Sequence, residues 1–268
     1  MFIKNKEESS MAQKKKEQGV VISQTTPAPG IFDMWIETTL VEQAKPGQFI
    51  AVYPKAESTL LPRPISICEA DRKAGRLRIV YRVAGKGTAE FSTYREGDGI
   101  SIMGTLGNGF PLAAGEGKKA LLIGGGIGVP PILELAKRLS AEKSIICGYR
   151  DANLFLKEDL EQYGDFYAAT EDGSVGIKGN VVDVLRSREL CGDVIYACGP
   201  MPMLRALKAY AQEKQIPAYI SLEERMACGV GACLGCVCKT TKKDAHSQVH
   251  NARICTDGPV FEAGEVDI

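Results

Sequence analysis

The chain has nine cysteines, and four of them crowd between Cys228 and Cys238, which constrains its folding more than any other feature. Cys228, Cys233 and Cys236 follow the spacing C-x4-C-x2-C, and Cys255 comes after eighteen intervening residues. This spacing is typical of a plant-type [2Fe–2S] site, in which four thiolates hold two irons. The segment has no regular period, so we expect loops and short strands organised by the cysteines.

The residues around these cysteines favour the same interpretation. Gly229, Gly231 and Gly235 can take positive φ and turn backbone N–H groups toward sulfur. Cys238 is separated from the nearest ligand by one residue, so we do not count it as a ligand. A zinc site would normally match one close cysteine pair with a second, and here the partner side offers Cys255 alone. Zinc is the alternative, whereas disulfides fit poorly in a reducing compartment.

Length and composition narrow the class of protein. The 268 residues, 44% hydrophobic and 25% charged, allow two ordinary globular domains and a small appendage. Lys plus Arg and Asp plus Glu both number 33, so bulk charge gives no support for a nucleic-acid partner. The apolar stretch 120–135 is broken by glycines, prolines and Glu134, and residues 1–17 form a polar tail. We therefore expect no membrane span, secretion signal or anchor, and a cytoplasmic protein.

The first third of the chain predicts an all-β domain over 18–115. Short β-runs with alternating polarity are broken by Gly and Pro every 8–15 residues, which is typical of an antiparallel barrel or sandwich. The runs are 19–24, 32–39, 47–54, 63–70, 76–84 and 98–105. A short helix is expected at 90–94, and the small polar stretch 113–119 predicts a linker.

From residue 116 to residue 220 the pattern changes to apolar strands alternating with amphipathic helices. Such alternation is typical of a parallel sheet covered on both faces, so we expect a doubly wound α/β domain. The strands are expected at 119–125, 143–149, 165–170, 193–200 and 218–222, and the helices at 130–140, 154–162, 181–190 and 203–214. Residues 221–268 then form the cysteine segment.

Two groups of residues have the chemistry to bind phosphates. Gly124, Gly126 and Gly128 follow a strand and begin a helix, where the backbone can approach a pyrophosphate. The strict G-x-G-x-x-G pattern is not met, and a tight turn without ligand is the alternative. In the β domain, the fork of Arg63 can hold a pyrophosphate, and the hydroxyl of Ser66 can contact a heterocycle nitrogen. Residues 85–88, G-K-G-T, add a helix start that can bind a further phosphate oxygen, and a solvated surface arginine is the alternative.

Acidic side chains after the third α/β strand bear on nucleotide choice. Glu171 and Asp172 can accept the hydroxyls of an adenosine ribose and repel a 2′-phosphate, which predicts a preference for NADH. The alternative is a turn whose acids face water.

The order of these motifs resembles the ferredoxin–NADP reductase superfamily. A β domain with R-P-I-S and G-K-G-T precedes an α/β domain with G-G-G-x-G-x-P-P and a C-G-P turn at 198–200. Two later segments restrict the resemblance to one family within this superfamily: SLEERMACGVGACLGCVCK and RICTDGPVF. Nearly end to end, the chain closely resembles the electron-transfer subunits of class 1B dihydroorotate dehydrogenase.

The resemblance implies FAD in the barrel and NAD in the α/β domain. The implied FAD contacts are Arg63, Pro64, Ile65, Ser66, Val80, Tyr81, Arg82, Gly87 and Thr88. The implied NAD contacts are Gly124, Gly126, Gly128, Gly199 and Pro200, with Ser66 and Cys198 as the catalytic residues. The superfamily has a tyrosine that stacks on the flavin where this chain has Ile65, and Tyr81 is the aromatic residue that can replace it.

The resemblance also implies a function and a partner. Dihydroorotate is oxidised at FMN in a separate catalytic subunit, and electrons pass through the [2Fe–2S] cluster and FAD to NAD⁺ in de novo pyrimidine (UMP) biosynthesis. Two copies of each subunit form a heterotetramer. The alternatives are an NAD(P)H:ferredoxin or sulfide-dehydrogenase-type reductase subunit and, from another class, a non-enzymatic nucleotide sensor stapled by zinc.

Overall fold

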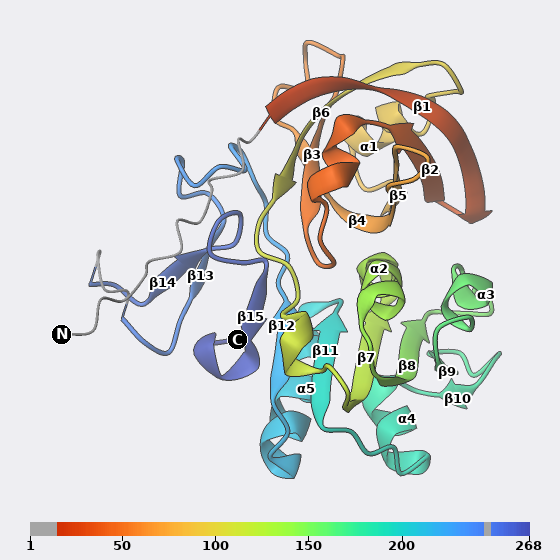
Figure 1. Ribbon diagram of the computed structural model, residues 1–268, viewed down its shortest axis with the longest axis vertical. Helices are drawn as coiled ribbons and strands as arrows, with labels where there is room; N and C mark the ends of the chain where they lie inside the picture. The colour runs from red at the N-terminus through yellow and green to blue at the C-terminus, as the bar shows by residue number, and fades with distance from the viewer. Residues whose placement is uncertain (1–14, 244–247) are drawn as a thin grey trace.

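A closed barrel, a mostly parallel sheet with helices and a C-terminal cysteine segment make up the fold (Figure 1). The computed structural model describes residues 15–243 and 248–268. Within these ranges no helix is long and apolar enough to cross a membrane.

The barrel consists of six antiparallel strands in the order β1-β2-β5-β4-β3-β6. Its interior is filled by side chains that alternate inward along each strand, as the period of two predicts. The strands are β1 (Lys15–Ala28), β2 (Ile31–Glu37), β3 (Phe49–Tyr53), β4 (Arg63–Asp71), β5 (Arg76–Arg82) and β6 (Gly99–Leu106), with the 3-10 turn η1 (Thr39–Gln43) and helix α1 (Lys86–Phe91). The all-β expectation is confirmed.

Two boundaries in this half differ from the sequence expectation. The predicted tail included residues 15–17, but these residues begin β1, where Lys15 lies opposite Gly104 of β6. The carboxylate of Glu17 accepts the backbone N–H of Thr39 at 2.9 Å, which ties this strand end to η1. The rest of the predicted tail lies outside the described residues. The short helix begins at Lys86 instead of residue 90, because the turn at Gly85 already starts it.

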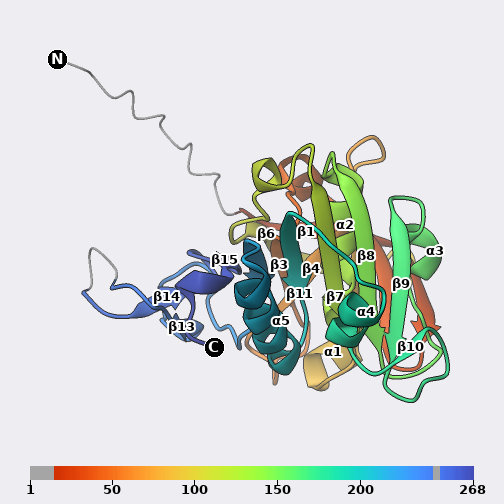
Figure 2. The same ribbon diagram turned by 90° about the horizontal axis from the view of Figure 1, so that it is seen from below.

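The α/β half is a seven-stranded sheet in the order β10-β9-β8-β7-β11-β12-β15. Helices cover both of its faces, α2 and α3 on one and α4 and α5 on the other (Figure 2), which confirms the doubly wound expectation. Its strands are β7 (Lys119–Gly125), β8 (Glu142–Tyr149), β9 (Asp165–Thr170), β10 (Ile177–Lys178), β11 (Val194–Cys198), β12 (Ala218–Ser221) and β15 (Val260–Glu262). Its helices are α2 (Pro130–Arg138), α3 (Lys157–Leu160), α4 (Val181–Ser187) and α5 (Met201–Lys214), with the 3-10 turns η2 (Leu112–Ala114), η3 (Gly126–Gly128) and η4 (Ala263–Glu265).

The C-terminal segment packs at one side of the molecule, against both the barrel and the sheet (Figure 1). Strands β13 (Val237–Lys239) and β14 (Asn251–Arg253) form a small antiparallel pair. β15 then returns to the large sheet, where Phe261 pairs with Ile220 of β12. The expected boundary at residue 220 therefore does not separate two independent sheets, because the last strand of the cysteine segment completes the α/β sheet.

Barrel and α/β half also meet directly, through β4 and α2. Cys68 on β4 and Val80 on β5 are buried in one apolar cluster with Val129 and Ile132 at the start of α2. The residues predicted to bind flavin and those predicted to bind NAD thus lie on two elements that share a core.

Candidate functional site

The cysteine loop brings four thiols together in two pairs. The thiols of Cys228 and Cys233 are in hydrogen-bond contact, and so are those of Cys236 and Cys255. Cys236 and Cys255 are buried, whereas Cys233 is exposed. A [2Fe–2S] cluster needs two thiolates on each of two irons, so two thiol pairs fit this group. No three His, Cys, Asp or Glu side chains within 15–243 and 248–268 form a compact set for a single metal ion.

Backbone N–H groups point at the sulfurs of this loop. Val230 N lies 3.4 Å from Sγ of Cys228, and Gly231 N lies 3.2 Å from Sγ of Cys255. Positive φ angles of 68° at Gly229 and 82° at Gly231 make these turns possible. Leu234 has a φ of 56°, which is uncommon for a residue with a side chain and was not expected from the sequence.

These contacts shift the acidity of the thiols. Burial would raise the pKa of Cys228, but hydrogen bonds from the backbone N–H groups of Val230, Cys233 and Ala232 lower it to about 6. Burial, followed by contact with the Cys236 thiol, raises the pKa of Cys255 to about 11. Because the thiolate is the form that binds metal, the lowered pKa of Cys228 favours metal binding at this loop.

Cys238 lies on a strand and not in the cysteine loop. It belongs to β13, opposite Ala252 of β14, and is half-buried. Burial raises its pKa, so its thiol stays protonated. Its place in a strand instead of the loop agrees with its exclusion from the predicted ligand set.

Arg63 lies against the first turn of α1, which brings the two predicted flavin motifs together. A Cβ atom on Gly87 would lie 2.9 Å from Nε of Arg63, so a side chain at this position would displace the guanidinium. Nη1 of Arg63 also donates to the carbonyl of Leu61 at 2.5 Å. A guanidinium beside a helix start is an arrangement that suits a pyrophosphate.

Ser66 occupies the face of β4 that looks toward the α/β half. Ile65 and Ile67, its neighbours in sequence, belong to the barrel interior. Cys68, two residues further on, packs in the cluster shared with α2. Because side chains alternate along a strand, Ser66 lies on the same side as Cys68. It is half-buried there, directly across from Phe49 of β3.

Two of the expected flavin contacts, Tyr81 and Val80, have buried side chains in the structure. The side chain of Tyr81 is 1% exposed inside the barrel, stacked on Phe32, and its hydroxyl donates to Oε1 of Gln24 at 2.8 Å. It therefore does not cover a flavin on the outer face, and that expectation is wrong. Val80 is also buried, so it can contribute only through its backbone, whereas Arg82 is exposed.

Thr88 uses its hydroxyl within the protein. Oγ1 accepts the backbone N–H groups of Ala84 at 2.9 Å and Gly85 at 3.2 Å, and it donates to the carbonyl of Gly85 at 3.1 Å. A hydroxyl has one proton and two lone pairs, so all of its hydrogen-bonding capacity is used. The predicted contact of Thr88 with a phosphate would therefore be made by its backbone.

The glycines of the predicted NAD loop have different roles. A Cβ on Gly124 would lie 2.8 Å from Cα of Val129, and one on Gly128 would collide with the carbonyl of Cys198. These two glycines are required by packing. Gly126 has a φ of 53° and no atom within 4 Å of a Cβ position, so its backbone is the open part of the loop.

The turn at 198–200 meets this loop. Cys198 ends β11 opposite Gly124 of β7, and Pro200 precedes α5. A Cβ on Gly199 would lie 3.1 Å from the backbone nitrogen of Gly125, so this glycine too serves a close approach. Burial raises the pKa of Cys198 to about 12, which keeps the thiol neutral.

Of the two acidic residues after β9, Glu171 and Asp172, only one has a carboxylate that is not engaged in hydrogen bonds of the turn. Oδ1 of Asp172 accepts the backbone N–H of Ser174 at 2.9 Å and its hydroxyl at 2.7 Å. These hydrogen bonds lower the pKa of Asp172. Glu171 is exposed. Asp172 is thus a turn residue, as the alternative had it, and Glu171 is the better candidate for a ribose contact.

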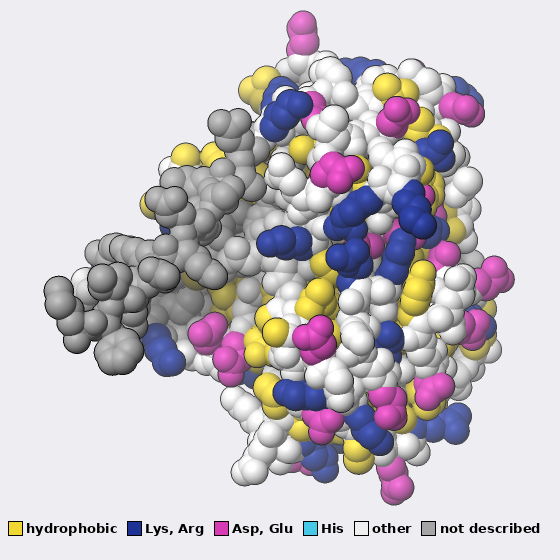
Figure 3. Space-filling view, in the orientation of Figure 1, with side chains coloured by type: hydrophobic (Ala, Val, Ile, Leu, Met, Phe, Trp, Pro, Cys, Tyr) yellow, Lys and Arg dark blue, Asp and Glu magenta, His cyan; other side chains and the backbone are white. Residues whose placement is uncertain are grey.

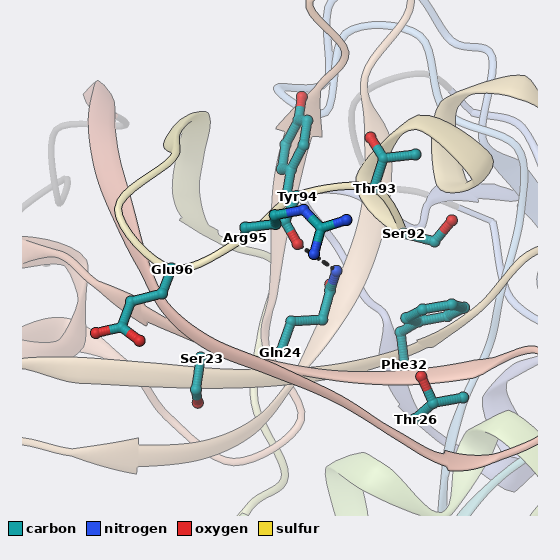
Figure 4. A pocket seen from close by; sticks show the side chains of 9 residues that line it. All are labelled: Ser23, Gln24, Thr26, Phe32, Ser92, Thr93, Tyr94, Arg95 and Glu96. Atoms are coloured by element: carbon teal, nitrogen blue, oxygen red, sulfur yellow. Dashed lines mark hydrogen bonds between the residues drawn. The ribbon is translucent and has the colours of Figure 1, made fainter.

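A separate pocket of about 600 Å³ opens near the chain segment after α1 (Figure 4). Gln24 reaches across it and donates from Nε2 to the carbonyls of Phe91 at 3.2 Å and Tyr94 at 2.9 Å. It is lined by Ser23, Gln24, Thr26, Phe32, Ser92, Thr93, Tyr94, Arg95 and Glu96. None of these residues belongs to the predicted sites.

Comparison with known proteins gives relatives along nearly the whole chain. The family model for the iron–sulfur cluster binding domain of dihydroorotate dehydrogenase B matches residues 223–267. The dihydroorotate dehydrogenase B (NAD(+)) electron transfer subunit of Bacillus caldolyticus is 45% identical over 258 residues, covering 94% of this chain and 98% of that one. The subunit of the same name from Bacillus cereus strain B4264 is 43% identical over 260 residues, with the same coverage.

Solved structures show the same architecture. A chain of an NADH-dependent reduced ferredoxin–NADP oxidoreductase has a TM-score of 0.83 at 28% identity, covering 93% of this chain and 89% of that one. A ferredoxin NADP⁺ reductase from Neisseria gonorrhoeae, solved with FAD and NADP, has a TM-score of 0.63 at 17% identity and covers 79% of this chain and 94% of that one. The second likeness concerns the fold alone.

Proposed function

This chain belongs to the family of dihydroorotate dehydrogenase B (NAD(+)) electron transfer subunits, and on that basis we propose roles for its residues. It is an oxidoreductase subunit, with FAD, a [2Fe–2S] cluster and NAD as cofactors, and it works with a catalytic subunit. NAD exchanges two electrons as hydride, an iron–sulfur cluster passes one at a time, and a flavin can do both.

In the proposed barrel site, Arg63 holds the FAD pyrophosphate beside the first turn of α1. The support is the place of its guanidinium, which lies against Gly87 and donates to the carbonyl of Leu61. Ser66 directs its hydroxyl to the reactive edge of the isoalloxazine, because it lies on the face of β4 that looks toward the α/β half. Pro64 and Ile65 line the same strand end, and the backbone from Val80 to Arg82 follows the cofactor.

In the proposed NAD site, Gly126 supplies an open backbone for the pyrophosphate. Cys198 and the turn through Gly199 and Pro200 lie beside this loop and border the nicotinamide. Cys198 keeps its proton, because burial raises the pKa of the thiol to about 12. Its proposed part in catalysis is therefore positioning of the ring by a neutral side chain.

The observation that carries the proposal is the position of the thiol pairs next to the barrel strands that bear the proposed flavin residues. Cys236 and Cys255 are buried in the same apolar core as Phe49 of the barrel. Phe49 lies directly across from Ser66. The proposed cluster ligands and the proposed flavin residue are therefore separated by a single barrel strand, as an electron-transfer route between them requires.

The finer assignment of the partner is also a proposal. We infer that the catalytic subunit carries FMN, oxidises dihydroorotate there and forms a heterotetramer of two copies of each chain, in cytoplasmic pyrimidine biosynthesis. Likeness to the NADH-dependent ferredoxin–NADP oxidoreductase supports a second candidate, a ferredoxin-linked reductase subunit.

Reconstitution tests these assignments. The purified chain should show flavin bands and broad thiolate-to-iron absorption, and mixing it with an FMN-containing dihydroorotate-oxidising subunit should give NAD⁺-linked dihydroorotate oxidation. Reduced ferredoxin, offered in place of that subunit, should not support NAD⁺ reduction. A colourless zinc protein would end the proposal, and activity with ferredoxin alone would favour the second candidate.

A further inference from the structure

Glu134 on α2 is the one acidic residue among the fully buried side chains of the described ranges, at 0% exposure. Oε2 accepts the backbone N–H of Ala70 on β4 at 3.0 Å. Oε1 lies 3.8 Å from Nη1 of Arg72 and has no hydrogen-bond partner among the described residues. A buried carboxyl oxygen without a hydrogen bond is costly, so such a group calls for an explanation beyond simple packing.

The place of Glu134 in the fold offers that explanation. β4 begins with Arg63 and Ser66, the proposed flavin residues, and carries Ala70 near its other end. α2 begins directly after the loop of Gly126, the proposed NAD residue, and carries Glu134 in its second turn. The hydrogen bond from Ala70 to Glu134 therefore joins the flavin strand to the NAD helix.

Besides the buried apolar packing, a second polar contact joins these elements, and it is more exposed. Nζ of Lys137 lies 2.7 Å from Oε1 of Glu69, with both side chains partly open to solvent. Figure 3 shows Lys and Arg side chains gathered over the middle of this face, where Figure 1 has β4 and α2. Exposed ion pairs contribute little, because water and salt screen them. The contact of Glu134 is shielded from both.

The groups around Glu134 favour the ionised form of its carboxyl group. Burial raises the pKa of Glu134, while the Ala70 N–H and then the charges of Lys137, Arg72 and Arg138 oppose that shift. The carboxyl group thus faces a backbone donor from the barrel and cations from both halves of the molecule.

We propose that Glu134 is a positioning residue for hydride transfer, which fixes the NAD loop at the distance from the flavin strand that the reaction needs. The inference rests on the proposed function. It assigns Glu134 no contact with either nucleotide: the residue acts through Ala70 and β4 on one side and through α2 on the other.

Three variants of the full chain, loaded with FAD, separate positioning from folding. Glu134→Gln keeps an oxygen that can accept the Ala70 N–H, Glu134→Asp shortens the reach, and Glu134→Ala removes the acceptor. We measure FAD content, the rate of flavin bleaching by NADH in stopped flow, and the isotope effect with NADH deuterated at the transferred position. Glu161→Ala is the matched control, because Glu161 directly follows α3 and its carboxylate contacts Lys157 of that helix.

We expect normal FAD content in all variants and a hydride-transfer rate within about twofold of wild type for Glu134→Gln. Glu134→Ala should slow the transfer roughly tenfold to a hundredfold and change the isotope effect, since small misplacements of reacting groups have effects of that size. Glu134→Asp should fall between them and carries the test if the alanine variant does not fold. Unchanged rates and isotope effects in Glu134→Ala or Glu134→Asp would overturn the inference. Failure of NADH to bleach the wild-type flavin would instead overturn the proposed function.

Discussion

Phe49 and Ser66 lie directly across from one another in the ladder of β3 and β4. Phe49 is buried in the core that also contains Cys236 and Cys255, and Ser66 faces the α/β half. The thiol loop reaches this pair through β6, because Gly229 lies against Leu106 and Leu106 pairs with Phe49. Because the two sites are connected in this way, a change at one can disturb the other, so cluster content and FAD content are measured in every variant.

The first prediction concerns the ligand set. Serine substitution of Cys228, Cys233, Cys236 or Cys255 should lower iron and acid-labile sulfide, because each removes one of four thiolates. Cys238→Ser is the matched control and should keep the cluster, since Cys238 lies in β13. Loss of the cluster in Cys238→Ser with retention in Cys255→Ser would show that the assignment is wrong.

The second prediction concerns FAD retention. Arg63→Ala should weaken FAD binding by about 1.5–3 kcal/mol, because a hydrogen bond to a charged group is lost. Ser66→Ala should keep FAD and slow its reduction by NADH. Arg95→Ala, an exposed arginine at the pocket of Figure 4, serves as control. Equal FAD content and equal reduction rates in all three variants would show that Arg63 and Ser66 do not form the FAD site.

Local patterns predicted the architecture well, because strand alternation, strand–helix repeats and cysteine spacing are all visible along the chain. The sequence does not show, however, which side of a strand faces another domain. Tyr81 and Val80 are both buried, one inside the barrel and the other against α2, so alternation alone does not say which faces a ligand. The same holds for Glu134, which in a helix of mixed polarity looks like a solvated charge. Its partner, Ala70, is 64 residues away.

The third prediction concerns the loop that carries Cys255. Asn108 donates from its backbone N–H to the carbonyl of Gly258 at 2.6 Å and from Nδ2 to those of Thr256 at 3.3 Å and Asp257 at 3.0 Å. Asn108→Ala removes the two side-chain bonds, which are exposed and together worth about 1 kcal/mol. Release of iron to a chelator should therefore be about fivefold faster, with NADH-dependent dye reduction unchanged.

The control for this prediction is Asn153→Ala, because Nδ2 of Asn153 bonds only locally, to Oδ1 of Asp151 at 2.7 Å. Its iron release should match wild type. Equal release rates in the two asparagine variants would mean that Asn108 does not hold the Cys255 loop.

The fourth prediction concerns nucleotide choice. The chain should prefer NADH to NADPH, because the exposed carboxylate of Glu171 repels a 2′-phosphate. Glu171→Gln should reduce this preference, measured as the ratio of kcat/KM values in dye reduction. Asp172→Asn should change it less, since Asp172 is engaged with Ser174. A clear preference of the wild type for NADPH would contradict the charge argument.

The last prediction separates the two halves of the electron route. Hydride exchange with NADH needs only the barrel and the α/β half, whereas oxidation of a dihydropyrimidine needs a second flavin and a base beside the substrate carbon. The chain alone should therefore reduce dyes with NADH and leave dihydroorotate untouched. Cys233→Ser, mixed with the catalytic subunit, should lose NAD⁺-linked dihydroorotate oxidation and keep most of its dye reduction, because Cys233 lies in the exposed part of the thiol loop. Full coupled activity in a variant shown to lack the cluster would mean that electrons reach NAD⁺ by another route.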